Sequence, residues 1–315
     1  MYIDKKYFYR VYGLNIDSNI EILEFPKRNE DFIDKDIVTI LYGQTPKNIL
    51  EEIKEGKSIH VTKEHVWFHI DHVATYCIEN GNTVIVDPCE DCDKSLMKVY
   101  IMGSVLGFIL LQRESTAIHG GTVVINGKAI IFTGERGAGK STLTTALVKR
   151  GYNFVADDVA ALSFDNKIVI EPGFPYHKLC FDALENMYYV KESYPCFHAD
   201  EKIKYIVPDF HGFAKEKFQL SAICELDMGE VDNVRVEEIR GGEKLNKIIK
   251  NIYRTEYIRS MGGMTPRYFK NCIEIAKRAK FYRITRPRDK YTVDDQIEII
   301  EGLFKEKAGF KAMQI

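Results

Sequence analysis

The chain has 315 residues, of which 45% are hydrophobic and 29% charged, and its formal net charge is −2. These values are typical of a globular protein of one large or two smaller domains, and so small a net charge predicts no nucleic-acid or membrane partner. The longest apolar run, residues 99–111, is shorter than the ~20 residues that a spanning helix needs. The first residues of the chain do not resemble a signal peptide, and the seven scattered cysteines favour reduced thiols, so we expect a cytoplasmic protein.

The first 92 residues carry short runs rich in β-branched and aromatic side chains, which predict strands. Asn80-Gly81 separates two of the runs and predicts a tight hairpin, because both residues tolerate the positive φ angles of such turns. We therefore predict a β-rich amino-terminal domain over residues 1–92, serving substrate docking or contacts in a homo-oligomer. The predicted strands are residues 7–12, 37–42, 65–70, 74–78 and 83–87.

A second domain is predicted over residues 93–315, beginning with a buried helix at 93–113. Two apolar runs, 117–125 and 128–133, are then joined by Asn126-Gly127, which predicts an antiparallel hairpin. The second run leads directly into a glycine-rich loop. Since phosphate-loop sheets otherwise join parallel strands through helices, this hairpin predicts an α/β fold with a mixed sheet.

The glycine-rich loop fits G-x-x-x-x-G-K-[ST], the Walker A motif, with a strand before it and a helix after it. Its glycines allow backbone N–H groups to point at phosphate oxygens, and the following helix adds its positive dipole end. Lys140 can reach the β- and γ-phosphates, and the Ser141 hydroxyl can bind Mg²⁺. The motif therefore predicts binding of ATP or a similar triphosphate with Mg²⁺. The predicted nucleotide-binding residues are Gly134, Glu135, Arg136, Gly137, Ala138, Gly139, Lys140, Ser141 and Thr142.

Two adjacent carboxylates, Asp157 and Asp158, follow a short predicted strand at 152–156. A bare Asp-Asp turn is more often solvated, but a strand end so close after Lys140 places this pair beside the phosphates. One carboxylate can hold Mg²⁺, and the other can accept the proton of an attacking hydroxyl.

The rest of the chain is predicted as strands and loops to residue 236, followed by a largely helical end. Prolines at 172 and 175 predict an ordered loop over 171–180. Lys178, Lys202 and Lys204 are basic candidates for phosphate or substrate contacts, although a single lysine is more often simply solvated.

The segment from about residue 115 to 162 resembles the catalytic core of the HPr kinase/phosphorylase family. The resemblance rests on His119-Gly, the hairpin, the phosphate loop with its helix, and Ala156-Asp-Asp. It implies a fold similar to phosphoenolpyruvate carboxykinase and phosphorylation of a serine hydroxyl in a small carrier protein. It also implies site roles, in which the two aspartates are interchangeable: phosphate binding by Lys140, Mg²⁺ binding by Ser141 and Asp158, a base at Asp157 and a substrate-side position for His119.

One family signature, similar to E-I-R-G-L-G, is absent from the stretch just after Asp158. The only similar string, residues 238–242, comes some eighty residues beyond it and before a predicted helix, so the signature arginine is not transferred. The departure weakens the case for a carrier protein as acceptor and for the reverse, phosphorylase reaction. The amino-terminal region is similar instead to divergent relatives such as lasso-peptide kinases, which act on a serine in a peptide.

The sequence thus predicts an ATP- and Mg²⁺-dependent kinase acting on a serine hydroxyl of a peptide or small protein. Two alternatives stay open: a kinase for a small metabolite such as free serine, and a nucleotide-gated binding or regulatory module that hydrolyses ATP slowly.

Overall fold

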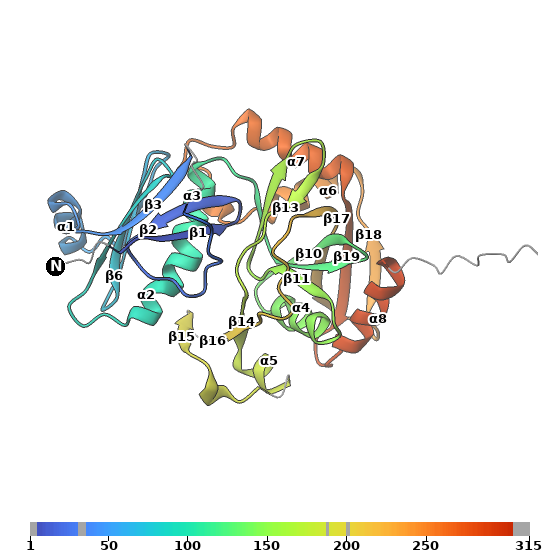
Figure 1. Cartoon of the computed structure of the whole chain (residues 1–315). Coiled ribbons are helices and arrows are strands. Elements are labelled where there is room, and N and C mark those ends of the chain that lie inside the picture. Colours follow the sequence, from blue (N-terminus) through green and yellow to red (C-terminus); the bar gives the residue numbers. More distant parts are fainter. Residues whose placement is uncertain (1–4, 31–35, 187–188, 200–201, 305–315) are drawn as a thin grey trace, which may run out of the picture.

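The structure, a computed structural model, describes residues 5–30, 36–186, 189–199 and 202–304. Within these residues the strands form sheets of seven, nine and three strands. The seven-stranded sheet lies at the left of Figure 1, the nine-stranded sheet at the right, and the small sheet below and between them. The arrangement is a mixed α/β fold.

The seven-stranded sheet confirms the five strands predicted near the amino terminus. Asn80 and Gly81 have the positive φ angles, 50° and 64°, that the predicted hairpin between β6 and β7 requires. Two short strands, β2 and β4, and one helix, α1, were not predicted, because their runs of five, three and eight residues are too short to give a clear pattern. In sheet order the strands are β1 (Tyr7–Val11), β2 (Leu14–Ser18), β3 (Ile37–Tyr42), β7 (Thr83–Pro88), β6 (Ala74–Glu79), β5 (His65–Ile70) and β4 (Ile59–Val61), and α1 spans Lys47–Lys54.

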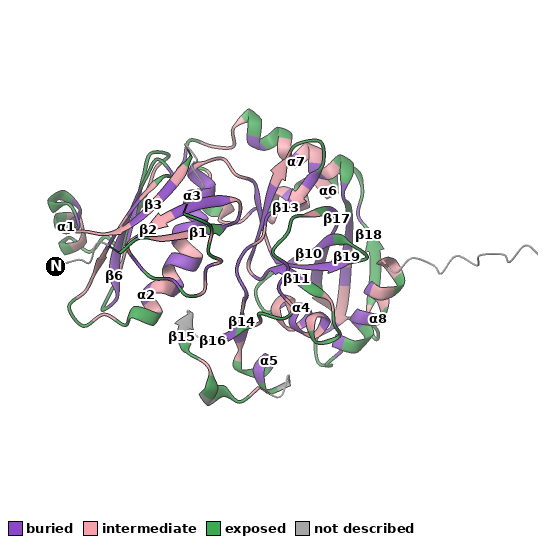
Figure 2. Cartoon of the chain, in the orientation of Figure 1, coloured by how far each residue is buried: buried purple, intermediate pink, exposed green. Residues whose placement is uncertain are grey.

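A continuous helix, Lys94–Gln112, packs on this sheet. It consists of α2 (Lys94–Tyr100), a π-helical turn (Ile101–Val105) and α3 (Leu106–Gln112). Its end is tied to the β6–β7 turn, where Gly81 N donates to Gln112 Oε1 over 2.9 Å. By length and composition alone this helix could cross a membrane, but 67% of its apolar window is buried inside the fold. It therefore serves here as a core helix (Figure 2).

The nine-stranded sheet is mixed, as the hairpin predicted. β9 and β10 pair antiparallel around Asn126-Gly127, whereas β10 pairs parallel with β17 on its other side. The path runs β11 (Asn153–Ala156), β9 (Gly121–Ile125), β10 (Lys128–Gly134), β17 (Phe218–Gly229), β13 (Ile168–Ile170), β12 (Val159–Phe164) and β8 (Ala117–His119), with β19 (Lys280–Pro287) beside β17 and β18 (Arg235–Glu238) beside β19.

Both faces of the nine-stranded sheet are covered, which explains why β10 reads as a continuous apolar run. Ile130 and Phe132 belong to one core with α4 (Lys140–Lys149) and α8 (Val293–Phe304). Ala129 and Ile131, which alternate with them, belong to the other core, with α6 (Gly241–Lys250) and α7 (Pro266–Arg278). That second core continues into the seven-stranded sheet. The domain division at residues 92 and 93 stays a prediction.

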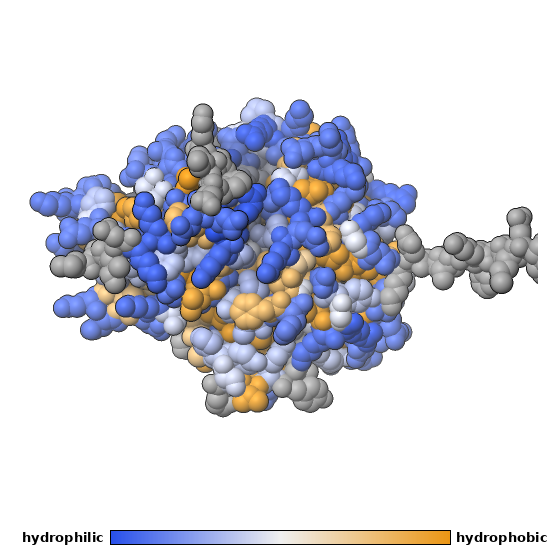
Figure 3. Space-filling model, in the orientation of Figure 1, coloured by the Kyte–Doolittle hydropathy of each residue, from blue (hydrophilic) through white to orange (hydrophobic). Residues whose placement is uncertain are grey.

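The small sheet corrects one expectation. Residues 171–180 were predicted as a loop, but Tyr176–Cys180 forms β14, because β16 (Lys202–Pro208) pairs with it antiparallel. A separate small core of buried residues supports this sheet. On the face of the molecule that Figure 3 shows, most side chains are hydrophilic, and apolar side chains gather near the centre. The remaining elements are β15 (Cys196–Ala199), α5 (Phe181–Asn186) and the 3-10 turns Lys191–Ser193 and Thr255–Tyr257.

Candidate active site

The phosphate loop adopts a backbone that requires glycine. Gly134, Gly137 and Gly139 have φ angles of 136°, 86° and 105°. A Cβ on Gly134 would lie 2.3 Å from the carbonyl oxygen of Leu226 on the parallel neighbour β17, so no other residue fits there. α4 then begins at Lys140. The loop is therefore fixed between the sheet and the amino end of a ten-residue helix, the geometry that binds phosphates.

A cavity of about 330 Å³ lies over this loop. We call it the phosphate cavity. Four cationic side chains line it, together with Asp158 and Asp182, and the cations are Arg136, Lys140, Lys178 and Lys204. Lys140 Nζ donates to the carbonyl oxygens of Gly134 and Glu135 over 2.8 and 3.1 Å, and burial lowers the pKa of Lys140. The excess of positive charge suits a polyphosphate.

Asp158 lies in the phosphate cavity as half of a buried ion pair. Its Oδ2 is 3.0 Å from Nζ of Lys178, a residue that is 9% exposed. Burial alone would raise the pKa of Asp158, but the charges of Lys178 and Lys204 outweigh it and hold that pKa well below its usual range. Asp158 in turn raises the pKa of Lys178 against the effect of burial. Both groups are therefore charged at neutral pH.

Asp157 faces the other way and does not line the phosphate cavity. It is 7% exposed, and its Oδ2 accepts a hydrogen bond from the backbone N–H of Lys178 over 2.8 Å. Its Oδ1 lies 3.6 Å from Nδ1 of His177. The two aspartates therefore have different surroundings, and the predicted assignment of Asp157 as the base and Asp158 as the metal ligand stays a prediction.

His177 is a buried side chain that the sequence did not single out. It is 0% exposed, and its Nε2 lies 3.6 Å from Asp209 Oδ2, opposite Asp157. The ring also contacts Phe154, with centroids 4.2 Å apart. Burial alone would lower the pKa of His177, but the two carboxylates raise it from 6.5 to about 9. The protonated imidazole of His177 thus lies between the carboxylates of Asp157 and Asp209.

This array predicts a pH-dependent stability. Because the folded state raises the pKa of His177, its contribution is complete below about pH 6.5 and is lost as pH rises through about 9. We expect the free energy of unfolding of the wild type, measured with denaturant at several pH values, to fall over that window by roughly 3 kcal/mol more than that of His177→Gln. The control variant His65→Gln, which changes an exposed histidine, should keep the wild-type pH dependence of stability. An identical slope in His177→Gln would contradict the assignment.

His119 stands on the wall of the phosphate cavity and is neutral. Its Nδ1 lies 3.1 Å from the carbonyl oxygen of Asp158, and since a carbonyl can only accept, Nδ1 carries the proton. Burial lowers the pKa of His119, although Asp158 opposes the shift. The ring nitrogen Nε2 is consequently left unprotonated, as an acceptor.

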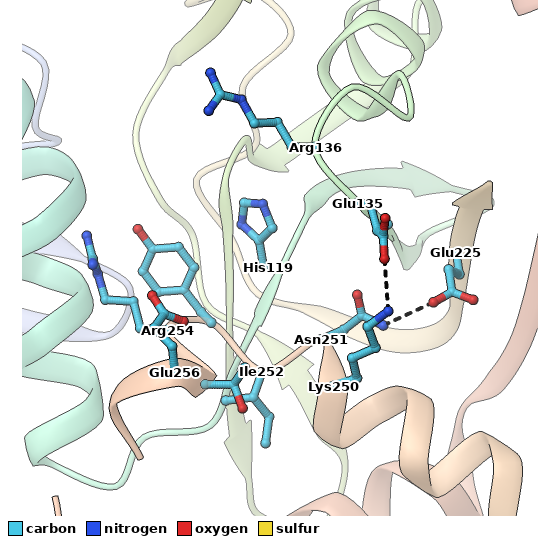
Figure 4. A pocket seen from close by; sticks show the side chains of 12 residues that line it. His119, Glu135, Arg136, Glu225, Lys250, Asn251, Ile252, Arg254 and Glu256 are labelled. Carbon is cyan, nitrogen blue, oxygen red and sulfur yellow. Dashed lines mark hydrogen bonds and ion pairs between the residues drawn. The ribbon is translucent and has the colours of Figure 1, made fainter. Parts of the chain in front are cut away.

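A second cavity, of about 450 Å³, lies beside the first (Figure 4). His119 and Arg136 line both cavities, so the two share a wall. The second cavity is otherwise formed by Gly134 and Glu135 at the start of the loop, by Glu225, and by residues 250–256 at and after the end of α6. Figure 4 shows Lys250 reaching Glu135 across it, and their atoms Nζ and Oε1 are 3.0 Å apart.

Glu225 fastens α6 to the sheet next to the phosphate loop. It is 7% exposed, pairs in register with Thr133 at the end of β10, and lies 2.8 Å from Lys247 Nζ. Asn251 completes the link, because its Oδ1 accepts from the Thr133 hydroxyl over 2.7 Å. The sequence did not predict these contacts, because Glu225 on β17 and Lys247 on α6 are far apart in the chain.

The residues present fit a magnesium ion. Among the described residues no three His, Cys, Asp or Glu side chains form a metal cluster. Mg²⁺ at a nucleotide site needs no such cluster, because phosphates and water supply most of its ligands. Ser141 and Asp158, the two predicted metal ligands, both line the phosphate cavity and offer oxygen atoms.

Comparison with known proteins finds similarity in the segment that contains the phosphate loop. The profile of the HPr Serine kinase C-terminal domain matches residues 112–173. The resemblance to the HPr kinase family is confirmed for this segment. The HPr kinase/phosphorylase of Polaromonas naphthalenivorans is 38% identical over 123 residues, which are 36% of this chain and 37% of that protein. The one from Bacillus subtilis is 52% identical over 67 residues, 21% of this chain and 22% of that protein.

The likeness is limited in extent, since the chain covers well under two thirds of the length of these relatives. A solved structure, the Hpr(Ser) kinase/phosphatase from Coxiella burnetii, is 14% identical and covers 59% of this chain and 92% of its own, with a TM-score of 0.29. The HPr kinase-like segment includes the phosphate loop and both aspartates. It ends before His177, Lys178 and the residues after α6, which only the structure brings to the site.

Proposed function

We propose that this protein is an ATP- and Mg²⁺-dependent kinase that transfers the γ-phosphoryl group to a serine hydroxyl of a peptide or small protein. The observation that carries the proposal is the convergence of Lys140, Ser141 and Asp158 on one cationic cavity over a Walker A loop. The related proteins are named HPr kinase/phosphorylase, which supports a phosphotransferase with a protein serine as acceptor.

The reaction would proceed by direct displacement. The serine oxygen forms a bond to the γ-phosphorus, the bond from that phosphorus to the β,γ-bridging oxygen breaks, and ADP leaves. Lys140 and the loop N–H groups stabilise the charge on the transferring group. Mg²⁺, when held by Ser141, would neutralise the phosphate oxygens.

For the hydroxyl proton we propose Asp158 rather than Asp157, which departs from the roles predicted for the pair. Asp158 lines the phosphate cavity, whereas Asp157 is occupied by the Lys178 N–H and by His177. Asp157 is then a positioning residue that sets the turn carrying Asp158. A low pKa does not disqualify Asp158, because phosphoryl transfer relies on orientation of the hydroxyl more than on early proton abstraction.

The proposal includes the fold type of the catalytic core and the cellular location of the protein. A strand–loop–helix unit flanked by an antiparallel β9 and a parallel β17 is compatible with a core of the phosphoenolpyruvate carboxykinase type. The seven cysteines are free thiols, which supports a cytoplasmic location.

The test is transfer from γ-labelled ATP with Mg²⁺ to serine-containing peptides, a small carrier protein, free serine, or no acceptor. We expect label on a peptide or protein serine and little hydrolysis without acceptor. Label on free serine alone would establish the small-metabolite alternative. ATP turnover unchanged by every acceptor, together with nucleotide-dependent binding of a partner, would establish the regulatory module instead.

A further inference from the structure

The second cavity lies at the end of the phosphate loop where the γ-phosphate belongs. Lys140, the residue that reaches the β- and γ-phosphates in such loops, rests its Nζ on the carbonyls of Gly134 and Glu135. Those two residues line the second cavity. The terminal phosphate would therefore face the second cavity.

The opposite end of the loop has its own space for the nucleoside. A smaller cavity, of about 160 Å³, is lined by Arg286 and Tyr291, and it contacts the loop at Gly137, Gly139 and Thr142 but not at Gly134 or Glu135. With the nucleoside there and the phosphates between, the second cavity lies on the side opposite the leaving group. In-line displacement requires the attacking oxygen to come from that side.

The charges in the second cavity indicate what it takes. Glu225 and Glu135 are already paired, with Lys247 and Lys250 respectively. Arg254 is also committed, since its guanidinium lies 4.6 Å from the Phe108 ring centre and donates to Ser104 Oγ over 2.7 Å. Glu256 is exposed and has no ion-pair partner among the residues that the structure describes. Arg136 also lines this cavity, but on the wall shared with the phosphate cavity, and Figure 4 shows it on the side away from Glu256. The charge left available at Glu256 is thus negative.

We infer that the second cavity is the acceptor site and that it takes a peptide segment whose serine has a cationic group next to it, paired with Glu256. This inference rests on the proposed kinase function. A volume of about 450 Å³ is in the range of sites for drug-sized ligands and exceeds what free serine needs. The serine hydroxyl reaches the γ-phosphate across the shared wall at His119, ADP leaves toward Thr142, and the hydroxyl proton goes to Asp158.

The test uses two synthetic serine peptides that differ only in carrying a lysine or a glutamate beside the serine, with free serine as a third acceptor. For the wild-type chain we expect kcat/KM about tenfold higher for the lysine peptide. Glu256→Lys should reverse that preference, and the matched control Glu298→Lys, an exposed change on α8, should retain it. Nucleotide affinity of Glu256→Lys, measured in parallel, separates a local effect from loss of the fold.

Three results would overturn the inference. Equal use of both peptides by the wild type, or an unchanged preference in Glu256→Lys with nucleotide binding intact, would place the acceptor elsewhere. Free serine as the best acceptor would exclude the peptide. Transfer to none of the three, despite nucleotide binding, would instead count against the proposed kinase function itself.

Discussion

Lys140→Ala is expected to lower phosphoryl transfer by roughly 10²–10³-fold, the usual cost of removing one preorganised charge from a transition state. The lysine Nζ already lies in the phosphate cavity, held by the Gly134 and Glu135 carbonyls, so little reorganisation precedes catalysis. Single-turnover transfer from γ-labelled ATP, with the best acceptor found, measures the effect.

The control for this change is Lys128→Ala, which removes an exposed lysine from the start of the same strand–loop unit. It should transfer at the wild-type rate. Thermal unfolding of Lys140→Ala should be near that of the wild type, because the side chain donates only to the loop. Transfer within a few-fold of normal in Lys140→Ala would show that the loop is not the phosphoryl-donor site.

Asp158→Asn is expected to lower transfer as severely, by roughly 10²–10³-fold, while Asp157→Asn lowers both transfer and stability. The first change removes the carboxylate beside the phosphates and leaves the Lys178 charge without its partner. The second leaves His177 with one carboxylate instead of two, so we also expect the pKa of His177 to fall. Transfer kinetics and denaturant unfolding, measured on both variants, separate the two roles.

Asp165→Asn is the matched control, since this exposed residue follows the other end of β12. If Asp157→Asn abolished transfer without loss of stability, and Asp158→Asn stayed active, then Asp157 would be the base and our assignment of Asp158 would be wrong.

Local signals made much of the fold predictable. The Asn126-Gly127 turn alone determined that β9 and β10 are antiparallel, because its backbone preference is independent of the rest of the chain. The α7 start was predictable in the same way, since Thr265 caps the helix by accepting from Tyr268 N. The β14 strand was not, because Tyr176–Cys180 follows two prolines and becomes a strand only through β16.

The residues of the candidate site likewise fall into those that a local pattern predicts and those that it does not. Lys140 and Ser141 belong to a contiguous motif, so spacing was enough to predict them. Lys178 had no such context, and its role depends on a strand pairing that no local pattern shows. Glu225 and Glu256 come from segments far along the chain, and only the parallel pairing of β10 with β17 brings the first of them beside the loop.

The turn between β11 and β12 has a consequence for how related chains can diverge. Asp157 and Asp158 occupy the whole connection between Ala156 and Val159, one anchored inside the protein and the other turned to the cavity. Because the two side chains face opposite ways, one residue inserted before them would shift which carboxylate faces the cavity, and one residue deleted would remove a carboxylate. Related chains should therefore vary in the strands on either side while conserving the length of this connection.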